Sequence, residues 1–269
     1  MKRQGRSPCK GDPTQAVTRE VFGYDLGMAP QGLKILVVDC VEKEALPLGG
    51  VDGWFRAALK KCDSKVEVKT VRASTPDWEK EVAWADAVMI SGSPRDAFAD
   101  DEWTHGLMAK VARLLEKKKP VLGVCYGHQI LGRVEGGKVG RCNEGWELGE
   151  TKVEVTPEGL SSPLLEGLPK QMNVMQSHRD CVWEVPGKGV LLASSPHTKV
   201  QAARWAETAY GVQFHPEFTG EVIRGVWAER RDKWRDQVKF NLDEKLDQAK
   251  ECPDGLAIFH NFLKMIGSR

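Results

Sequence analysis

The chain has 269 residues, which is enough to bury a full hydrophobic core in one large α/β domain or in two small domains. Its 39 basic and 38 acidic side chains give a formal charge of +1, so no overall field favours nucleic acid or an anionic membrane as a partner. Nowhere do eighteen apolar residues run together, and the basic N-terminal residues precede no apolar segment of a secretion signal.

Seven cysteines are scattered through the chain, at positions 9, 40, 62, 125, 142, 181 and 252. They form no Cys-x-x-Cys pair and no zinc-type grouping with the six histidines. We therefore expect reduced thiols, no metal and no cofactor. Reduced thiols and the lack of a leader together predict a cytosolic (cytoplasmic) location.

The first part of the chain alternates between strand and helix patterns. Residues 1–30 are polar or small with weak periodicity, and we interpret them as a tail or strap. The expected elements that follow are a strand at 33–39, a helix around 54–59, strands at 66–71 and 86–90, and a helix at 104–117. This alternation predicts an α/β fold with a doubly wound, mostly parallel sheet flanked by helices.

The strongest signal lies between positions 121 and 130. An apolar, strand-like run stops at Cys125, and the chain turns at once through Gly127 into a helical pattern. A nucleophile on such a tight turn is held above the sheet, beside the first free N–H groups of the following helix. Those groups and the helix dipole favour a thiolate and a developing oxyanion. The pattern predicts a nucleophilic cysteine, although most buried cysteines act only as small hydrophobes.

Short runs at 152–155, 190–193 and 200–203 are bounded by Pro and Gly and indicate further strands, some of them antiparallel. Another strand-like segment, 210–214, ends at His215, and Glu217 follows two positions later. A cysteine nucleophile needs a base to take its proton, and the base needs a partner that fixes its tautomer. Cys125, His215 and Glu217 supply these parts and form the expected catalytic triad.

Three other histidines are weaker candidates for the base. His128 lies three residues past the nucleophile on the expected helix, where it is poorly placed to orient a third group, so we assign it a support role. We expect His178 in a polar loop and His260 in a structural role.

The last fifty residues shift in composition. Mixed-sign charge runs at 228–235 and 243–247 are typical of the solvated faces of helices. An amphipathic segment at 256–263 is expected to pack on the sheet. We therefore expect residues 31–219 to form the main domain and residues 220–269 to form a helical extension that packs on it.

The two chemical motifs together resemble the class I glutamine amidotransferases, whose pattern has a Gly-x-Cys-x-Gly-x-Gln elbow and a later His-Pro-Glu. The matching residues are Gly123, Cys125, Gly127 and Gln129 for the elbow, and His215, Pro216 and Glu217 for the second motif. The resemblance covers about residues 33–218 and implies the flavodoxin-like fold of that family.

The loop at 90–98 is similar to the stand-alone branch that contains plant gamma-glutamyl peptidases, although its composition also suits an ordinary turn. The resemblance implies an oxyanion hole made by the backbone N–H groups of Gly92 and Tyr126. It further implies that Gln129 contacts the glutamyl group and that the region of Arg179 and Asp180 holds the α-amino and α-carboxyl ends of the substrate. Many members of the family have glycine where this chain has Arg179.

These expectations lead to a cysteine-dependent hydrolase or transferase that cleaves γ-glutamyl amides, such as glutathione or its conjugates, through a γ-glutamyl thioester. One alternative is the glutaminase subunit of an amidotransferase, whose synthase would be a separate chain because no second catalytic domain follows residue 269. Another is a regulatory or non-catalytic relative, against which the retention of His215 and Glu217 argues. The expected partners are a small γ-glutamyl substrate and, in the first alternative, the synthase; nucleic acid and membrane are not expected.

Overall fold

The computed structural model describes residues 20–23, 25–27, 31–43, 46–228 and 230–268. Most of the expected N-terminal tail, residues 1–19, 24 and 28–30, lies outside the described residues. Of the described part, Phe22 and Leu26 are buried in the main core, and the Gly27 carbonyl lies 3.0 Å from Nε2 of His260. These contacts attach this segment to the domain and give His260 a structural contact.

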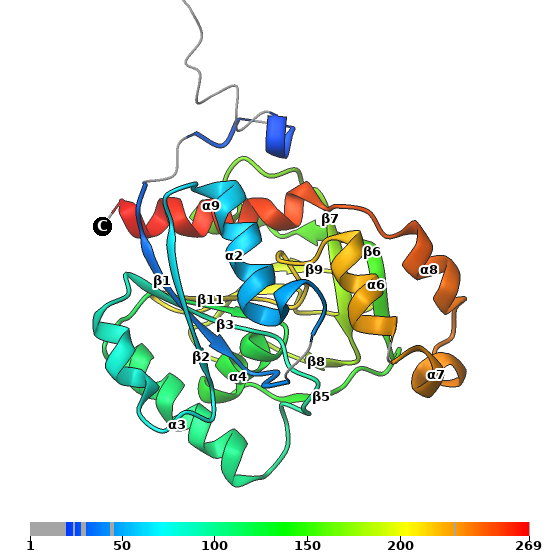
Figure 1. Ribbon diagram of the computed structural model, residues 1–269, viewed down its shortest axis with the longest axis horizontal. Coiled ribbons are helices and arrows are strands. Elements are labelled where there is room, and N and C mark those ends of the chain that lie inside the picture. The colour runs from blue at the N-terminus through cyan, green and yellow to red at the C-terminus, as the bar shows by residue number, and fades with distance from the viewer. Residues whose placement is uncertain (1–19, 24, 28–30, 44–45, 229, 269) are drawn as a thin grey trace, which may run out of the picture.

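A nine-stranded sheet in the order β2-β1-β3-β4-β11-β10-β9-β6-β7 forms the centre of the molecule (Figure 1). The five parallel strands are β2 (Glu67–Arg72), β1 (Lys34–Asp39), β3 (Ala87–Ile90), β4 (Val121–Val124) and β11 (Ala209–Val212). The antiparallel strands are β10 (Ala202–Ala206), β9 (Val190–Ser194), β6 (Glu147–Val155) and β7 (Gln171–His178). A separate antiparallel pair consists of β5 (Val139–Arg141) and β8 (Asp180–Val182).

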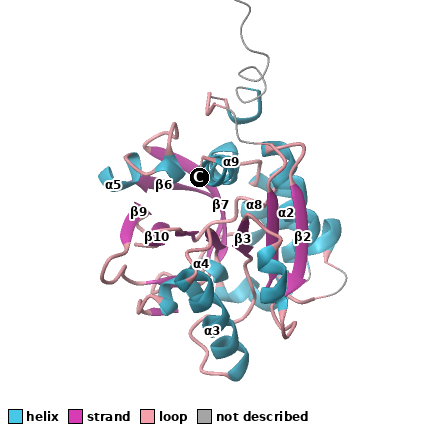
Figure 2. Ribbon diagram, turned by 90° about the vertical axis from the view of Figure 1, so that its left-hand side faces the viewer, coloured by secondary structure: helices cyan, strands magenta, loops and turns pink. Residues whose placement is uncertain are grey.

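Helices cover both faces of the sheet, and Figure 2 shows α9 and α3 on opposite sides of it. One face carries α2 (Gly50–Cys62), α6 (Gly220–Ala228) and α9 (Pro253–Gly267), and the other carries α3 (Glu102–Glu116) and α4 (Tyr126–Val134). The shorter helices are η1 (Pro47–Gly49), η2 (Trp78–Ala83), α5 (Pro157–Leu160), η3 (Pro163–Leu165), α7 (Arg231–Trp234), η4 (Arg235–Gln237) and α8 (Leu242–Gln248).

The apolar residues of β1 explain why two layers form. Successive strand residues point to opposite faces, so Ile35 and Val37 join the core under α2 and α9, whereas Leu36 and Val38 join the core under α3 and α4. A strand that is buried on both faces has a continuous apolar sequence. The predicted doubly wound, mostly parallel sheet is confirmed.

The prediction was wrong around His178. This residue does not lie in a polar loop but ends β7, which pairs along its length with β6, and its side chain is buried. Polar residues can be buried in this strand because other side chains bind them: Nε2 of Gln176 donates to Oε1 of Gln201, and Nε2 of His178 lies 2.9 Å from Oε2 of Glu147. The pattern of the strand alone therefore resembled that of a loop.

The carboxyl ends of β3, β4 and β11 meet at one edge of the sheet. In open α/β sheets, ligands bind outside the carboxyl ends of the parallel strands. Gly92, Cys125 and His215 each follow one of these three strands within a few residues. The described part of the chain contains no helix that is both long and apolar enough to cross a membrane.

Candidate active site

Cys125 occupies a strained turn between β4 and α4, with φ 50° and ψ −100°. Two glycines allow the strand and the helix to approach closely. A Cβ at Gly123 would lie 2.5 Å from the carbonyl carbon of Gly127, and a Cβ at Gly127 would lie 2.4 Å from the carbonyl oxygen of Ile90. The backbone N–H of Cys125 also donates to the Val212 carbonyl, which ties the turn to β11. The expected nucleophile elbow is therefore present in the backbone.

His215 and Glu217 form a buried pair beside this turn, with 2.8 Å between Nδ1 of the histidine and Oε1 of the glutamate. Stacking on Phe218 and a hydrogen bond from the His215 N–H to the Met175 carbonyl hold the imidazole in place. Burial disfavours the imidazolium, but the negative charges of Glu217 and Cys125 outweigh burial and raise the pKa of His215 to about 10. The arrangement keeps a proton on His215.

Gly92 and Tyr126, which are expected to form the oxyanion hole, both lie next to Cys125. Tyr126 is the first residue of α4, so its N–H is one of the groups that have no acceptor within a helix. Gly92 packs closely against both His215 and Cys125, because a Cβ at position 92 would lie 2.8 Å from Cε1 of His215 and 3.6 Å from the Cβ of Cys125. No other residue type fits at position 92 without displacing the imidazole.

Two hollows meet at Cys125, which lines both. The narrow half has a volume of about 40 Å³, and its walls include Val41, Leu46, Trp54, Gly92, His215 and Phe218. The wide half has a volume of about 210 Å³, and its walls include Gln129, Trp146, Arg179, Asp180, Lys233 and Trp234. All three residues expected to bind substrate lie in the wide half, and the expected base lies in the narrow half.

Gln129 is buried, and its amide nitrogen already has partners. It donates to the Asp180 carbonyl at 2.8 Å and to Oε1 of Gln213 at 3.1 Å. The Asp180 carbonyl also lies 3.1 Å from Nδ1 of His178. Two donors therefore fix the backbone beside the wide half, and Gln129 has a bracing role in addition to any contact with substrate.

The carboxylate of Asp180 is bound by Arg141, with 2.6 Å between Nη1 and Oδ1. The same guanidinium lies 3.2 Å from both carboxylate oxygens of Asp96. Burial raises the pKa of Asp180 to about 6, and the nearby negative charge of Asp96 acts in the same direction, while Arg141 opposes both. The sequence-based prediction missed Asp96 and Arg141, because the pairing of β5 with β8 that brings Arg141 opposite Asp180 was not predicted.

Gln213 is a further residue that the sequence-based prediction missed. Its side chain is fully buried and its Nε2 lies 3.6 Å from Sγ of Cys125, as a donor to the sulfur. A signal was available, because Gln213 stands two positions before His215 and alternate residues of an extended chain share a face. Together with Gln129 it links the Asp180 backbone to Sγ of Cys125 through hydrogen bonds.

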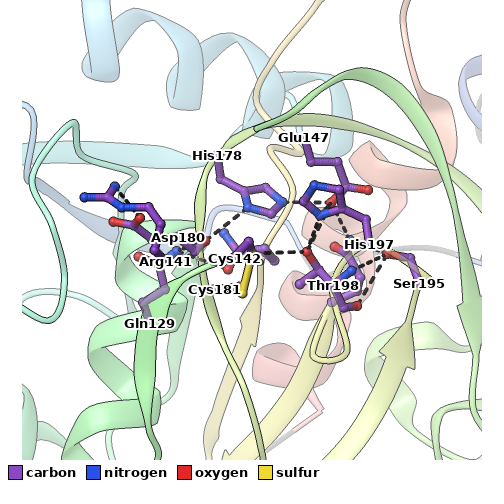
Figure 3. Close-up of a disulfide and its surroundings, with 12 residues drawn as sticks. Gln129, Arg141, Cys142, Glu147, His178, Asp180, Cys181, Ser195, His197 and Thr198 are labelled. Carbon is purple, nitrogen blue, oxygen red and sulfur yellow. Dashed lines mark hydrogen bonds and ion pairs between the residues drawn. A yellow bond between two sulfur atoms is a disulfide. The ribbon is translucent and has the colours of Figure 1, made fainter. Parts of the chain in front are cut away.

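Cys142 and Cys181 form a disulfide beside the wide half (Figure 3). The expectation of reduced thiols is wrong for this pair, whereas Cys40, Cys62, Cys125 and Cys252 are free. The two cysteines are 39 positions apart, and only the pairing of β5 with β8 brings them together. Cys9 lies outside the described residues, and the cytosolic location stays a prediction.

A buried polar cluster lies next to the disulfide (Figure 3). Glu147 contacts Nε2 of His178 at 2.9 Å and also accepts a hydrogen bond from Gln201. Burial alone would raise the pKa of Glu147, but the hydrogen bond and charge of His178 hold it below its usual value. Among the described residues, no group of His, Cys, Asp or Glu has the arrangement of a metal site.

His128 is fully buried behind the elbow, and its ring packs against Trp205. Burial lowers the pKa of His128 to about 3, so this histidine stays neutral. A neutral, enclosed imidazole at this position is consistent with the support role expected for it.

The chain is similar to known proteins over more than half of its length. Residues 50–229 match the family model of glutamine amidotransferase class-I. Gamma-glutamyl peptidase 5 of Arabidopsis thaliana is 35% identical over 157 residues, which cover 58% of this chain and 62% of the peptidase. A GMP synthase [glutamine-hydrolyzing] subunit from Methanopyrus kandleri is 39% identical over 146 residues, which cover 54% of this chain and 73% of that relative.

Solved structures show the same fold at lower identity. A glutamine amidotransferase from Thermotoga maritima superposes with a TM-score of 0.70 at 20% identity, over 88% of this chain and 99% of that one. The matched region spans less than two thirds of the first peptidase relative, so the family rather than the activity follows from these matches. The family match extends over more than half of the chain and includes both motifs, and the chain therefore belongs to the class I glutamine amidotransferase family.

Proposed function

We propose that the protein is a cysteine-dependent γ-glutamyl hydrolase or transferase. The observation that carries this proposal is the strained elbow of Cys125 beside the buried His215–Glu217 pair. The similarity to plant gamma-glutamyl peptidases supports a peptide substrate. In this proposal Cys125 is the nucleophile, His215 the acid and base, and Glu217 the group that orients and charges His215.

The proposed reaction begins with His215 as an imidazolium and Cys125 as a thiolate. The thiolate attacks the γ-carbonyl carbon, and the N–H groups of Gly92 and Tyr126 stabilise the oxyanion. His215 gives its proton to the departing nitrogen as the C–N bond breaks, which leaves a γ-glutamyl thioester on Cys125. His215 then takes a proton from water, the hydroxide attacks the thioester, and glutamate leaves as the pair is restored.

The location of His215 supports a proposed role for each half of the site. Because His215 must reach the departing nitrogen, the leaving amine lies in the narrow half. The glutamyl group, with one positive and one negative charge, then occupies the wide half, whose walls carry both carboxylates and cations. In this proposal Gln129, Arg179 and Asp180, which line the wide half, bind the glutamyl group.

A second candidate function is a glutaminase that delivers ammonia to a separate synthase. The size of the narrow half favours it, since about 40 Å³ holds roughly three water molecules at about 10–15 Å³ each. Ammonia fits this space, whereas a departing peptide must extend out of it. The similarity to GMP synthase subunits supports a synthase partner for this alternative.

The test is to incubate the purified chain with glutamine and, separately, with glutathione and its S-conjugates. Free glutamate and the released amine are followed by mass spectrometry, with Cys125→Ala as the inactive variant and Cys252→Ala as a matched cysteine substitution outside the site. We expect cleavage of the peptides by the wild type and by Cys252→Ala only. Turnover of glutamine alone would support the glutaminase, and no turnover of either substrate would refute both enzymatic proposals for the isolated chain.

A further inference from the structure

Two buried glutamines link the backbone beside the wide half to the sulfur of Cys125. Nε2 of Gln129 lies 2.8 Å from the Asp180 carbonyl and 3.1 Å from Oε1 of Gln213. Nε2 of Gln213 in turn lies 3.6 Å from Sγ of Cys125. Only 2% of Gln129 and 0% of Gln213 is exposed, so these hydrogen bonds form away from water. We refer to Gln129 and Gln213 as the glutamine pair.

The direction of every hydrogen bond in this chain follows from its first acceptor. A backbone carbonyl only accepts hydrogen bonds, so the Asp180 carbonyl must face the NH2 group of Gln129. The second hydrogen of that group points to Gln213, whose amide oxygen must then face Gln129. The NH2 group of Gln213 therefore faces Sγ of Cys125. The amide of Gln213 presents a donor, and not its oxygen, to the sulfur.

Both ends of the chain are anchored in the fold. At one end, the disulfide joins the residue after Asp180 to the residue after β5 (Figure 3). At the other end, the N–H of Cys125 donates to the carbonyl of Val212, which directly precedes Gln213. The amide of Gln213 and the sulfur are thus held in place by the fold itself, as is required of a donor that stabilises charge during a reaction.

We propose that Gln213 is a further catalytic residue, which stabilises the negative sulfur of Cys125, and that Gln129 is a positioning residue, which acts through Gln213. In the proposed reaction the sulfur is negative before it attacks the γ-carbonyl carbon and again when water releases glutamate. An N–H group directed at the sulfur stabilises that charge at both stages, and no proton is transferred. The inference rests on the proposed function, because it takes Cys125 as the nucleophile. It extends that function by giving both glutamines a part in the rate of the reaction.

Substitutions at position 213 test the donor. Gln213→Met removes the donor, whereas Gln213→Glu keeps the shape of the side chain and its contact with Gln129 but places a carboxylate at the sulfur. Loss of a hydrogen bond to a charged group lowers a rate about 10- to 100-fold, so Gln213→Met should lower kcat by this factor for glutathione or glutamine, whichever the wild type cleaves. Gln213→Glu should lower kcat further, because its negative charge repels that of the sulfur. KM should stay unchanged in both variants, since Gln213 lines neither half of the site.

A double-mutant cycle tests the role of Gln129. Gln129→Met leaves the Gln213 amide free to turn its oxygen toward the sulfur, so this variant should also lower kcat. Because the effect passes through Gln213, Gln129→Met should lower kcat no further in the Gln213→Met background. Gln176→Met is the matched control, because Gln176 is also fully buried but donates to Gln201; its kcat should equal that of the wild type. Circular dichroism checks that each variant is folded.

The rate at which iodoacetamide alkylates Cys125 adds a measurement that does not depend on turnover. Mass spectrometry of the peptide that carries Cys125 follows this rate, which should fall in both variants of Gln213 and stay unchanged in Gln176→Met. Unchanged alkylation in the Gln213 variants, or a loss confined to KM, would overturn the role of Gln213. Additive losses of kcat in the double variant would overturn the role of Gln129. Lack of turnover by the wild type, together with the expected pattern of alkylation, would instead refute the proposed function and leave the glutamine pair supported.

Discussion

Replacement of Glu217 by Gln tests whether the Glu217 carboxylate keeps the imidazole of His215 protonated. The substitution keeps the shape of the side chain but removes the negative partner at 2.8 Å from Nδ1. A hydrogen bond to a charged group contributes about 1.5–3 kcal/mol, and one pKa unit corresponds to about 1.4 kcal/mol. The variant should therefore lower the pKa of His215 by about one to two units from its value of about 10 in the wild type.

The sign of the effect on activity follows from the role of the proton. A histidine with a raised pKa keeps its proton as the pH rises through neutrality and loses it only near pH 10. Because the protonated form donates to the departing nitrogen, kcat/KM should fall on the alkaline side as that proton is lost. In Glu217→Gln the fall should begin at a lower pH, and the maximum should also be reduced.

The assay is the pH profile of kcat/KM for wild type and variant, from neutral pH through the alkaline limb, with circular dichroism at each pH. Glu147→Gln is the matched control, because Glu147 makes a similar buried contact of 2.9 Å, but with His178. That control should leave the alkaline limb in place. If the limb of Glu217→Gln coincides with that of the wild type, the assigned source of the His215 charge is wrong.

Two further perturbations test the packing around the site and the disulfide. Gly92→Ala should lower kcat about 100-fold, because the new Cβ would lie 2.8 Å from Cε1 of His215 and displace the imidazole. Gly106→Ala, on the open surface of α3, should leave kcat unchanged, and equal activity of the two variants would contradict the close packing at position 92. Reduction of the Cys142–Cys181 disulfide opens a loop of 39 positions and should lower the free energy of unfolding by about 4 kcal/mol in the chain-entropy model. Urea denaturation with and without dithiothreitol measures this change, and Cys142→Ser should show no further effect of the reductant. An unchanged urea midpoint for the wild type would contradict the presence of the bond.

Local sequence determined the elements that carry the chemistry. The β-branched runs of β1, β3 and β4 must be buried on both faces, and the glycines at 123 and 127 permit the one tight turn that places Cys125 before a helix. The step of two residues from His215 to Glu217 across Pro216 keeps both side chains within hydrogen-bonding distance. For these residues, conformation depends mainly on near neighbours in the chain, and so the motif could be read directly.

The rest of the site depended on contacts between distant segments. Arg141 meets Asp180, Cys142 meets Cys181 and Glu147 meets His178 only because antiparallel strand pairs set their register. Polar residues that these contacts satisfy have the composition of a loop, which is why β7 was not expected. The register of strands far apart in the chain is set by the packing of the whole core.

The C-terminal extension shows the same contrast between what the local sequence indicates and what tertiary contacts decide. Its mixed charges determine exposed helices, and the sequence by itself indicated no more than a solvated surface around Lys233 and Trp234. The tertiary structure decided that α7 lies against the wide half, where Trp234 stacks on Arg179. The sequence determined the tight turn at Cys125, the neighbouring His215–Glu217 pair and the layered fold, because these follow from local turns and strand periodicity. The shape and charge of the pocket beside Cys125 were decided only when remote segments packed together.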